Sequence, residues 1–123
     1  NQILILGDPN RIQQLFDNLM QNSFRYTDAG GQVKIDMHQN NGHVVLEWYD
    51  SAPGVSDKDI GMLFDRLYRV EASRNRAKGG SGLGLAICQN IVHAHEGSIV
   101  ATHSPLGGLK LTILFPRRMI EPN

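Results

Sequence analysis

The most informative segment of the chain lies in its first quarter and reads Asn18-Leu19-Met20-Gln21-Asn22-Ser23-Phe24-Arg25-Tyr26-Thr27. Upstream, Asp8-Pro9-Asn10 has the form of a helix start, with proline near the first helical position. From there, one stripe at helical spacing consists of Ile12, Leu15, Phe16, Leu19, Met20 and Ser23. The stretch therefore predicts a long helix that packs by this stripe and ends in the turn Thr27-Asp28-Ala29-Gly30-Gly31.

A second feature of this helix is a polar flank. Asn18 and Asn22 are four residues apart and Arg25 follows three later, so the three side chains share one side of the helix. Carboxamide oxygens beside a guanidinium suit a magnesium–phosphate group, because Mg²⁺ prefers oxygen ligands completed by phosphate and water. The alternative is an ordinary solvated helix face.

The rest of the chain alternates strands and helices without regular βαβ order. Val33, Ile35 and Met37 alternate with polar residues as in a half-buried strand, and Asn40-Asn41-Gly42 is a hairpin signal before a strand from His43 to Asp50. A short helix begins at Ser56 and is expected to end near Phe64 to Leu67. The polar residues 69–78 predict a mobile loop, and residues 82–96 predict a second long helix broken at Gly97. Two further strands cover 99–103 and 109–115. This order favours an α+β fold, a two-layer sandwich with helices on one face of a mixed sheet.

Three more constellations carry chemical meaning. Gly80-Ser81-Gly82-Leu83-Gly84 leads into a helix, whose free N–H groups favour an anion, although the run is equally typical of a hinge. Asp50 ends a strand before Ser51-Ala52-Pro53-Gly54, where its carboxylate could accept a hydrogen bond from an exocyclic amine such as that of adenine, or simply start a turn. The polar loop gathers four cations, as either a solvated loop or a phosphate-binding lid: Arg69, Arg74, Arg76 and Lys78.

Composition is that of an ordinary soluble globular domain, with 41% hydrophobic and 20% charged residues. The 12 Lys and Arg residues balance the 12 Asp and Glu residues, so no global field attracts nucleic acid or anionic lipid, and we expect no nucleic-acid partner. No apolar run approaches the roughly 20 residues that span a bilayer, and the first residues do not resemble a signal peptide. The single cysteine, Cys88, favours a reducing compartment and reads as a small hydrophobe on a helix.

The order and spacing of these motifs resemble the catalytic domain of bacterial sensor histidine kinases. The segment from Asn18 to Thr27 is similar to their N box, Asp50 to Gly54 to the G1 box, Leu63 to Arg69 to the F box, and Gly79 to Ala86 to the G2 box. Gly107-Gly108 stands where a third glycine box belongs. Two further stretches resemble the BaeS type of envelope-stress sensor kinase: residues 50–57 and 73–77.

The resemblance implies the Bergerat ATP-binding sandwich, with ATP and Mg²⁺ as cofactors, over residues 1–123 as a single domain. It implies Asn22 as the main Mg²⁺ ligand with Asn18 assisting, and Asp50 as the group that binds the adenine amine beside Gly54. It further places Arg25, Tyr26, Arg69 and Lys78 around the nucleotide and its phosphates, with Arg69 at the γ-phosphate. The phosphate cradle would consist of Gly80, Gly82, Leu83 and Gly84.

Two positions depart from the family pattern: Gln21 replaces an acidic residue before the second N-box asparagine, and Ala52 replaces a glycine of the G1 box. The water-activating relatives carry a glutamate four residues before the metal-binding asparagine, where this chain has Asn18, which cannot act as a base near neutral pH. The chain is therefore suited to transfer of a phosphoryl group rather than to hydrolysis.

A phosphoacceptor histidine is not evident among the five histidines, since His95-Glu96 has the bare His-acid order without the rest of that motif. The expected partners are a separate dimerisation domain that carries the acceptor and, through it, a response regulator. We expect the fragment to be monomeric, the whole kinase to be homodimeric, and this domain to lie on the cytoplasmic side of the bacterial inner membrane. The alternatives are a Bergerat-fold ATPase of the gyrase or MutL kind and a nucleotide-responsive binding module without kinase activity.

Overall fold

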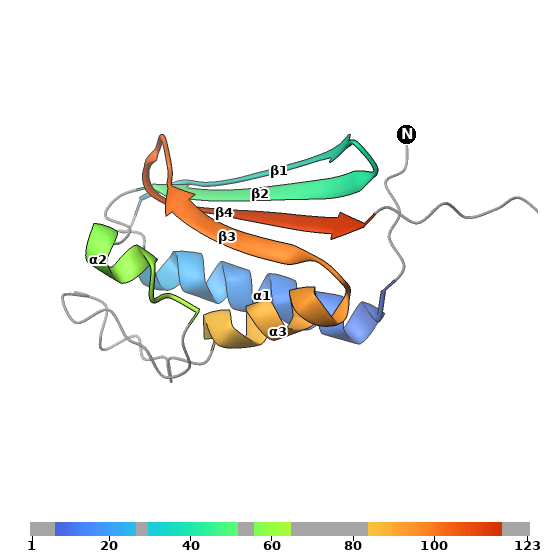
Figure 1. The fold of residues 1–123 in the computed structure, drawn as a ribbon. Coiled ribbons are helices and arrows are strands. Elements are labelled where there is room, and N and C mark those ends of the chain that lie inside the picture. Colours follow the sequence, from blue (N-terminus) through green and yellow to red (C-terminus); the bar gives the residue numbers. More distant parts are fainter. Residues whose placement is uncertain (1–6, 27–29, 52–55, 65–83, 117–123) are drawn as a thin grey trace, which may run out of the picture.

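Three helices and four strands make up the described part of the chain (Figure 1). The structure, a computed structural model, describes residues 7–26, 30–51, 56–64 and 84–116, without the side chains of Arg25 and Tyr26. In chain order the elements are α1 (Pro9–Tyr26), β1 (Val33–Asn40), β2 (His43–Ser51), α2 (Asp57–Ile60), α3 (Gly84–Ala94), β3 (Ser98–His103) and β4 (Gly107–Pro116). Each predicted helix and strand is present, but α2 ends at Ile60, earlier than the predicted end near Phe64 to Leu67. The second long helix is described from Gly84 onwards, and the predicted mobile loop at residues 69–78 lies outside the described residues.

The four strands form one sheet in the order β1-β2-β4-β3, and each described pair is antiparallel rather than mixed. The hairpin between β1 and β2 turns at Asn41 and Gly42, both of which have positive φ, as the predicted two-residue turn requires. Figure 1 shows α1 and α3 lying side by side across one face of the sheet. The prediction of a two-layer α+β sandwich is thus confirmed.

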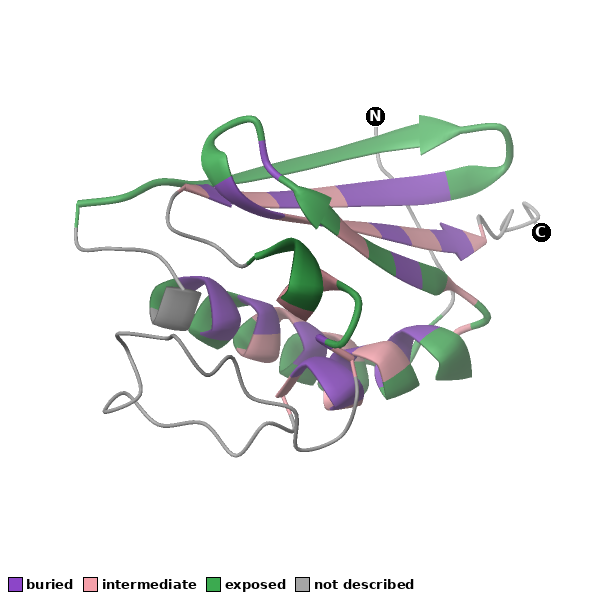
Figure 2. Ribbon diagram, turned by 60° about the vertical axis from the view of Figure 1, so that its left-hand side comes forward, coloured by how far each residue is buried: buried purple, intermediate pink, exposed green. Residues whose placement is uncertain are grey.

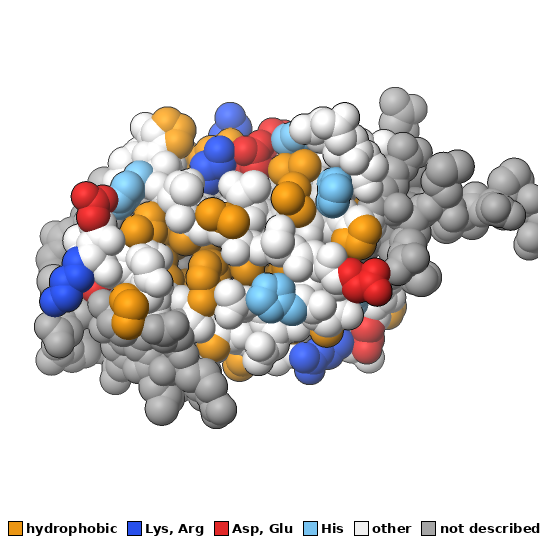
Figure 3. Space-filling model, in the orientation of Figure 1, with side chains coloured by type: hydrophobic (Ala, Val, Ile, Leu, Met, Phe, Trp, Pro, Cys, Tyr) orange, Lys and Arg blue, Asp and Glu red, His pale blue; other side chains and the backbone are white. Residues whose placement is uncertain are grey.

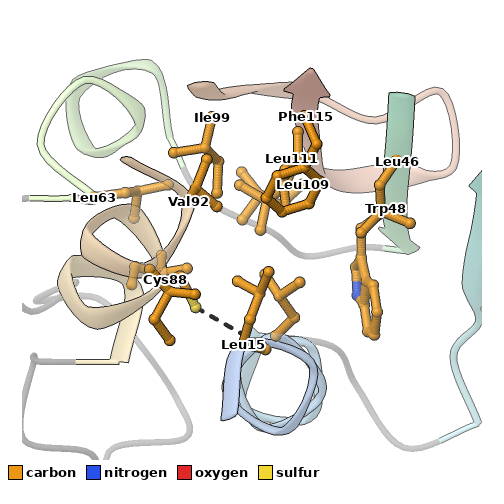
Figure 4. Packing of buried hydrophobic residues seen from close by; sticks show 14 of the residues in the cluster. Leu15, Leu46, Trp48, Leu63, Cys88, Val92, Ile99, Leu109, Leu111 and Phe115 are labelled. Atoms are coloured by element: carbon orange, nitrogen blue, oxygen red, sulfur yellow. Dashed lines mark hydrogen bonds between the residues drawn. The ribbon is translucent and has the colours of Figure 1, made fainter. Parts of the chain in front are cut away.

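The core fills the space between this sheet face and the two long helices (Figure 4). Leu15 and Leu19 of α1 and Ile91 of α3 are completely buried against residues of β2 and β4. The Cys88 thiol lies 3.9 Å from the Leu15 carbonyl oxygen, and burial raises the pKa of this thiol to about 12. Cys88 is therefore an unreactive core residue, as the sequence predicted.

The two long helices run antiparallel. His95, just beyond α3, accepts a hydrogen bond at Nε2 from the backbone N–H of Asp8, which starts α1, at 3.1 Å. Cys88, two turns earlier, lies beside Leu15. Because residues one helical turn apart lie about 5.4 Å apart along the axis, the first turn of α3 lies alongside the turn of α1 that carries Asn18 and Asn22.

The edge strand β1 differs from its sequence expectation. Val33, Ile35 and Met37 point to the same sheet face as Asp50, Trp48 and Leu46, their partners on β2, yet all eight β1 residues are exposed. Figure 2 shows β1 exposed along its whole length while β2 beside it is largely buried. The prediction of a half-buried strand is therefore wrong in burial although right in direction, because β1 is one of the two edge strands and has a neighbouring strand on one side only.

Candidate nucleotide-binding site

The end of β2 presents Asp50 toward the helix layer. The pairing between β2 and β4 shifts between Tyr49 and Ser51, so Asp50 sits at an irregularity of the ladder. Its side chain compensates for the lost pairing: Oδ1 accepts a hydrogen bond from the backbone N–H of Leu109 at 2.6 Å. Asp50 is thus held by the fold at a fixed point, with 1% of its surface exposed.

A second hydrogen bond ties Asp50 to α1. The Ser23 hydroxyl donates to Asp50 Oδ2 at 3.1 Å and accepts from the Trp48 indole N–H at 2.7 Å. All three side chains are buried, with Ser23 exposed by 1% and Trp48 by 3%. The chain Trp48–Ser23–Asp50–Leu109 therefore joins α1, β2 and β4 through four polar groups that water does not reach.

Gly108 is required beside this carboxylate. A Cβ at this position would overlap the Ser51 carbonyl oxygen and both Oδ1 and the carbonyl oxygen of Asp50. Only a residue without a side chain lets β4 approach the end of β2 so closely. The third glycine box predicted from the sequence thus has a packing role, the close approach of backbone to Asp50.

Burial shifts the ionisation of Asp50. Removal from water raises the pKa of this carboxyl above its ordinary value, and the hydrogen bonds from Leu109 and Ser23 oppose the shift. A buried carboxylate with two accepted hydrogen bonds in a fixed geometry is suited to accept one more hydrogen bond from an amine. This arrangement exceeds what an aspartate needs to begin a turn, which was the alternative interpretation of its sequence context.

Asn18 and Asn22 occupy the neighbouring turn of α1. Asn22 is 4% exposed and Asn18 is half-buried, so Asn22 is not part of a solvated helix face. Among the described residues, the Nδ2 atoms of both side chains are buried without a hydrogen-bond partner. Because unpaired buried polar atoms are costly, both carboxamide nitrogens have capacity to donate to a ligand such as a phosphate oxygen. A carboxamide oxygen is, in addition, the kind of ligand that Mg²⁺ prefers.

The structure brings these groups to one end of the sandwich. Ser23, adjacent to Asn22, contacts Asp50 directly, and Gly84 begins α3 beside the same stretch of α1. A Cβ on Gly84 would meet no other atom within 4 Å, and Gly84 itself is half-buried. Arg25 and Tyr26 continue α1, without described side chains. Six predicted site residues lie outside the described ranges: Gly54, Arg69, Lys78, Gly80, Gly82 and Leu83.

Sequence reasoning missed Trp48 and the polar role of Ser23, which it assigned only to the helical stripe. A signal was present, since a hydroxyl on a stripe of otherwise apolar residues must be buried and must find partners. The identity of those partners was not readable, because Trp48 and Asp50 are 25 and 27 residues away along the chain.

His95 has a structural role. Its Nδ1 lies 2.8 Å from the Ile91 carbonyl oxygen and its Nε2 accepts from Asp8, so the imidazole is the neutral Nδ1–H tautomer. His95 is half-buried with both ring nitrogens engaged, which agrees with its exclusion as a phosphoacceptor.

Comparison with known proteins identifies the family to which the chain belongs. A model of the histidine kinase-, DNA gyrase B- and HSP90-like ATPase family matches residues 7–119. The chain is 56% identical to the signal transduction histidine-protein kinase BaeS of Escherichia coli strain K12 over 94% of its own length and 25% of that protein's. It is 34% identical to the sensor histidine kinase CpxA of the same strain, over 91% of the chain and 24% of CpxA. The chain thus spans about a quarter of the length of these relatives.

Solved structures of histidine kinases share the fold of this chain. The mycobacterial sensor histidine kinase MprB superimposes with a TM-score of 0.83 at 26% identity, over 94% of this chain and 78% of that one. The catalytic domain of histidine kinase ThkA gives a TM-score of 0.78 at 25% identity, over 92% and 70%. The predicted resemblance to the BaeS type is confirmed by the sequence identity. The chain belongs to the histidine kinase-, DNA gyrase B- and HSP90-like ATPase family, as a catalytic domain of the sensor histidine kinase type.

Proposed function

We propose that residues 1–123 form the catalytic ATP-binding domain of a sensor histidine kinase, which binds Mg-ATP and donates the γ-phosphoryl group to a histidine on a separate dimerisation domain. The observation that carries this proposal is the buried carboxylate of Asp50, which Leu109 and Ser23 hold next to the turn of α1 whose two carboxamide nitrogens lack a partner among the described residues. An adenine amine would donate to Asp50, and the phosphates would extend toward Asn22 and the start of α3.

Each described residue has a task in this proposal. Asp50 selects adenine because its carboxylate accepts hydrogen bonds from an amine, and a carbonyl at the same place would be repelled. Asn22, assisted by Asn18, would hold Mg²⁺, which supplies neutralisation of phosphate charge. The free N–H groups at the start of α3, at Gly84, favour the phosphates through the helix dipole.

The remaining assignments come from the sequence and are proposed with the same function. Arg25, Tyr26, Arg69 and Lys78 would contact the nucleotide and its phosphates, Gly54 would let the backbone approach the base, and the loop glycines with Leu83 would cradle the phosphates. Asn18 stands where hydrolytic relatives carry a base, so phosphoryl transfer is favoured over hydrolysis.

Partners and location follow from the same proposal. The acceptor domain belongs to the same protein, the response regulator acts through it, and the fragment is monomeric whereas the whole kinase is homodimeric. None of the described helices is long and apolar enough to span a membrane. We place the domain on the cytoplasmic side of the inner membrane, where ATP is available.

The deciding experiment is a calorimetric titration with a non-hydrolysable ATP analogue and Mg²⁺ on the wild type, Asp50→Asn and Asp17→Asn. Asp17→Asn makes the same chemical change at an exposed position on α1. We expect saturable binding at one site in the wild type and the control, and its loss in Asp50→Asn. Binding indifferent to Asp50 would mean that the adenine pocket is elsewhere, and no binding by the wild type would favour a module without kinase activity.

A further inference from the structure

The outer face of the sheet, opposite the helices, carries a cluster of three side chains from two neighbouring strands. Asp36 and His38 lie two residues apart on β1 and therefore point the same way, and Glu47 of β2 is the direct cross-strand partner of Asp36. His38 Nδ1 is 3.7 Å from Asp36 Oδ2 and 3.9 Å from Glu47 Oε1. Figure 3 shows histidine, acidic and basic side chains together along the upper rim, over the sheet.

The two carboxylates of this cluster, Asp36 and Glu47, would be stabilised by a cation between them. Two carboxylates directly opposite each other on antiparallel strands repel and destabilise the pair. Lys110 of β4 neutralises only one side, since its Nζ lies 2.9 Å from Glu47 Oε2. That contact engages Oε2 and leaves Oε1 directed toward His38. Lys110 thus orients one carboxylate of the cluster, as partners of metal-binding carboxylates do.

The spacing of the donor atoms suits a small divalent ion. One imidazole nitrogen and two carboxylate oxygens all lie within 4.8 Å of one another. A tetrahedral Zn²⁺ with bonds of about 2.0–2.1 Å holds its ligand atoms about 3.3 Å apart, so small side-chain rotations would close the site. Both strands are paired along this stretch, which fixes the backbone from which the three side chains extend.

We propose that Asp36, His38 and Glu47 form a binding site for a borderline divalent cation of the Zn²⁺ class, with water completing the coordination. The ligand set distinguishes this ion from Mg²⁺, which prefers oxygen ligands alone. The site lies on the sheet face opposite Asp50 and is independent of the proposed nucleotide site. A bound ion would link β1 to β2 and so stabilise the exposed edge strand.

The competing occupant is a proton. A protonated His38 would itself be a cation between the two carboxylates, with no need for a metal. The two occupants exclude each other, because metal coordination needs a free imidazole nitrogen.

The test titrates the untagged chain, without nucleotide or Mg²⁺, with Zn²⁺ by calorimetry and with Co²⁺ by visible absorption. We expect one equivalent per chain, a Co²⁺ absorption band of low coordination number, and a Tm that rises with Zn²⁺. His38→Gln and Glu47→Gln should each lose the binding heat, the band and the Tm increase. His93→Gln removes an exposed histidine of α3 outside the cluster and should keep all three.

Each other outcome overturns the proposal. Uptake that persists in His38→Gln would show adventitious binding elsewhere, and no uptake by the wild type would show that the cluster does not bind a metal. Far-UV circular dichroism verifies that the variants fold. We expect native spectra, because the Asp36 and His38 side chains are exposed and Glu47 is only half-buried.

Discussion

At the scale of single residues, the ionisation of Asp50 has consequences for both binding and stability. Its pKa is raised in the folded protein, mainly by burial, so the folded state holds this proton more tightly than the unfolded chain does. The contribution of Asp50 to stability is therefore most favourable at low pH and decreases as the pH rises through the raised pKa. Nucleotide binding runs the other way, because an adenine amine needs the ionised carboxylate.

We predict that affinity for the ATP analogue falls on acidification, at a pH above the ordinary pKa of an aspartate. Calorimetric titrations at a series of pH values measure this decrease in affinity. An affinity that stays constant down to the ordinary aspartate range would contradict the assignment of Asp50 as the acceptor.

Ser23 is predicted to position Asp50. Ser23→Ala removes a hydrogen bond that lowers the pKa of Asp50 and leaves the Trp48 N–H buried without an acceptor. We expect a loss of about 1–3 kcal/mol in the free energy of unfolding, measured by urea denaturation, because one buried donor is unpaired. We also expect the affinity for the ATP analogue to fall at a higher pH than in the wild type.

Trp48→Phe is the matched control for Ser23→Ala. It removes the indole N–H but keeps an aromatic ring against Phe16, whose ring centroid lies 6.4 Å from that of Trp48, and it keeps the bond from Ser23 to Asp50. In Trp48→Phe, the affinity for the ATP analogue should therefore fall at the same pH as in the wild type. An equal shift in both variants would indicate general loosening of the site.

At the scale of elements, Gly97 at the end of α3 allows the chain to pack closely against β4. Glu96 adopts a positive φ of 62°, and the backbone N–H groups of Glu96 and Gly97 donate to His93 and Val92 as in a Schellman motif. Gly97 itself has no room for a side chain, because a Cβ would overlap the Leu114 carbonyl oxygen of β4. The glycine at the predicted helix break is therefore required by packing against β4, since the left-handed residue at this helix end is Glu96.

We predict that Gly97→Ala lowers the free energy of unfolding by about 1–3 kcal/mol, since β4 must shift to admit a methyl group. Gly61→Ala is the control, because a Cβ there meets nothing within 4 Å and φ is −74°. Urea denaturation of both variants measures the difference, and equal stabilities would show that β4 gives way without cost.

At the scale of the whole molecule, three of the five described histidines have contacts or positions that do not suit a phosphoacceptor. His95 holds the ends of α1 and α3 together, and His38 lies on the sheet face opposite Asp50. His103 contacts Asp57 of α2 at 2.5 Å. We therefore predict that the chain does not label itself with radioactive ATP but labels an added acceptor domain.

The matched control for this transfer assay is Asp50→Asn, which should abolish labelling of the acceptor. Self-labelling of the isolated chain would contradict the prediction. Steady release of phosphate without labelling of the acceptor would favour the ATPase alternative.

The sequence by itself determined what depends on near neighbours. Asp8-Pro9 predicted the start of α1, Asn41-Gly42 the hairpin, and the ordered boxes the family, because caps, turns and periodicity act over a few residues. Only the tertiary structure decided which residues meet across the fold. Ser23 contacts Asp50, Leu109 contacts Asp50 and β1 remains exposed, because contacts between residues 27 or 59 apart depend on how the layers pack and on which strand is outermost.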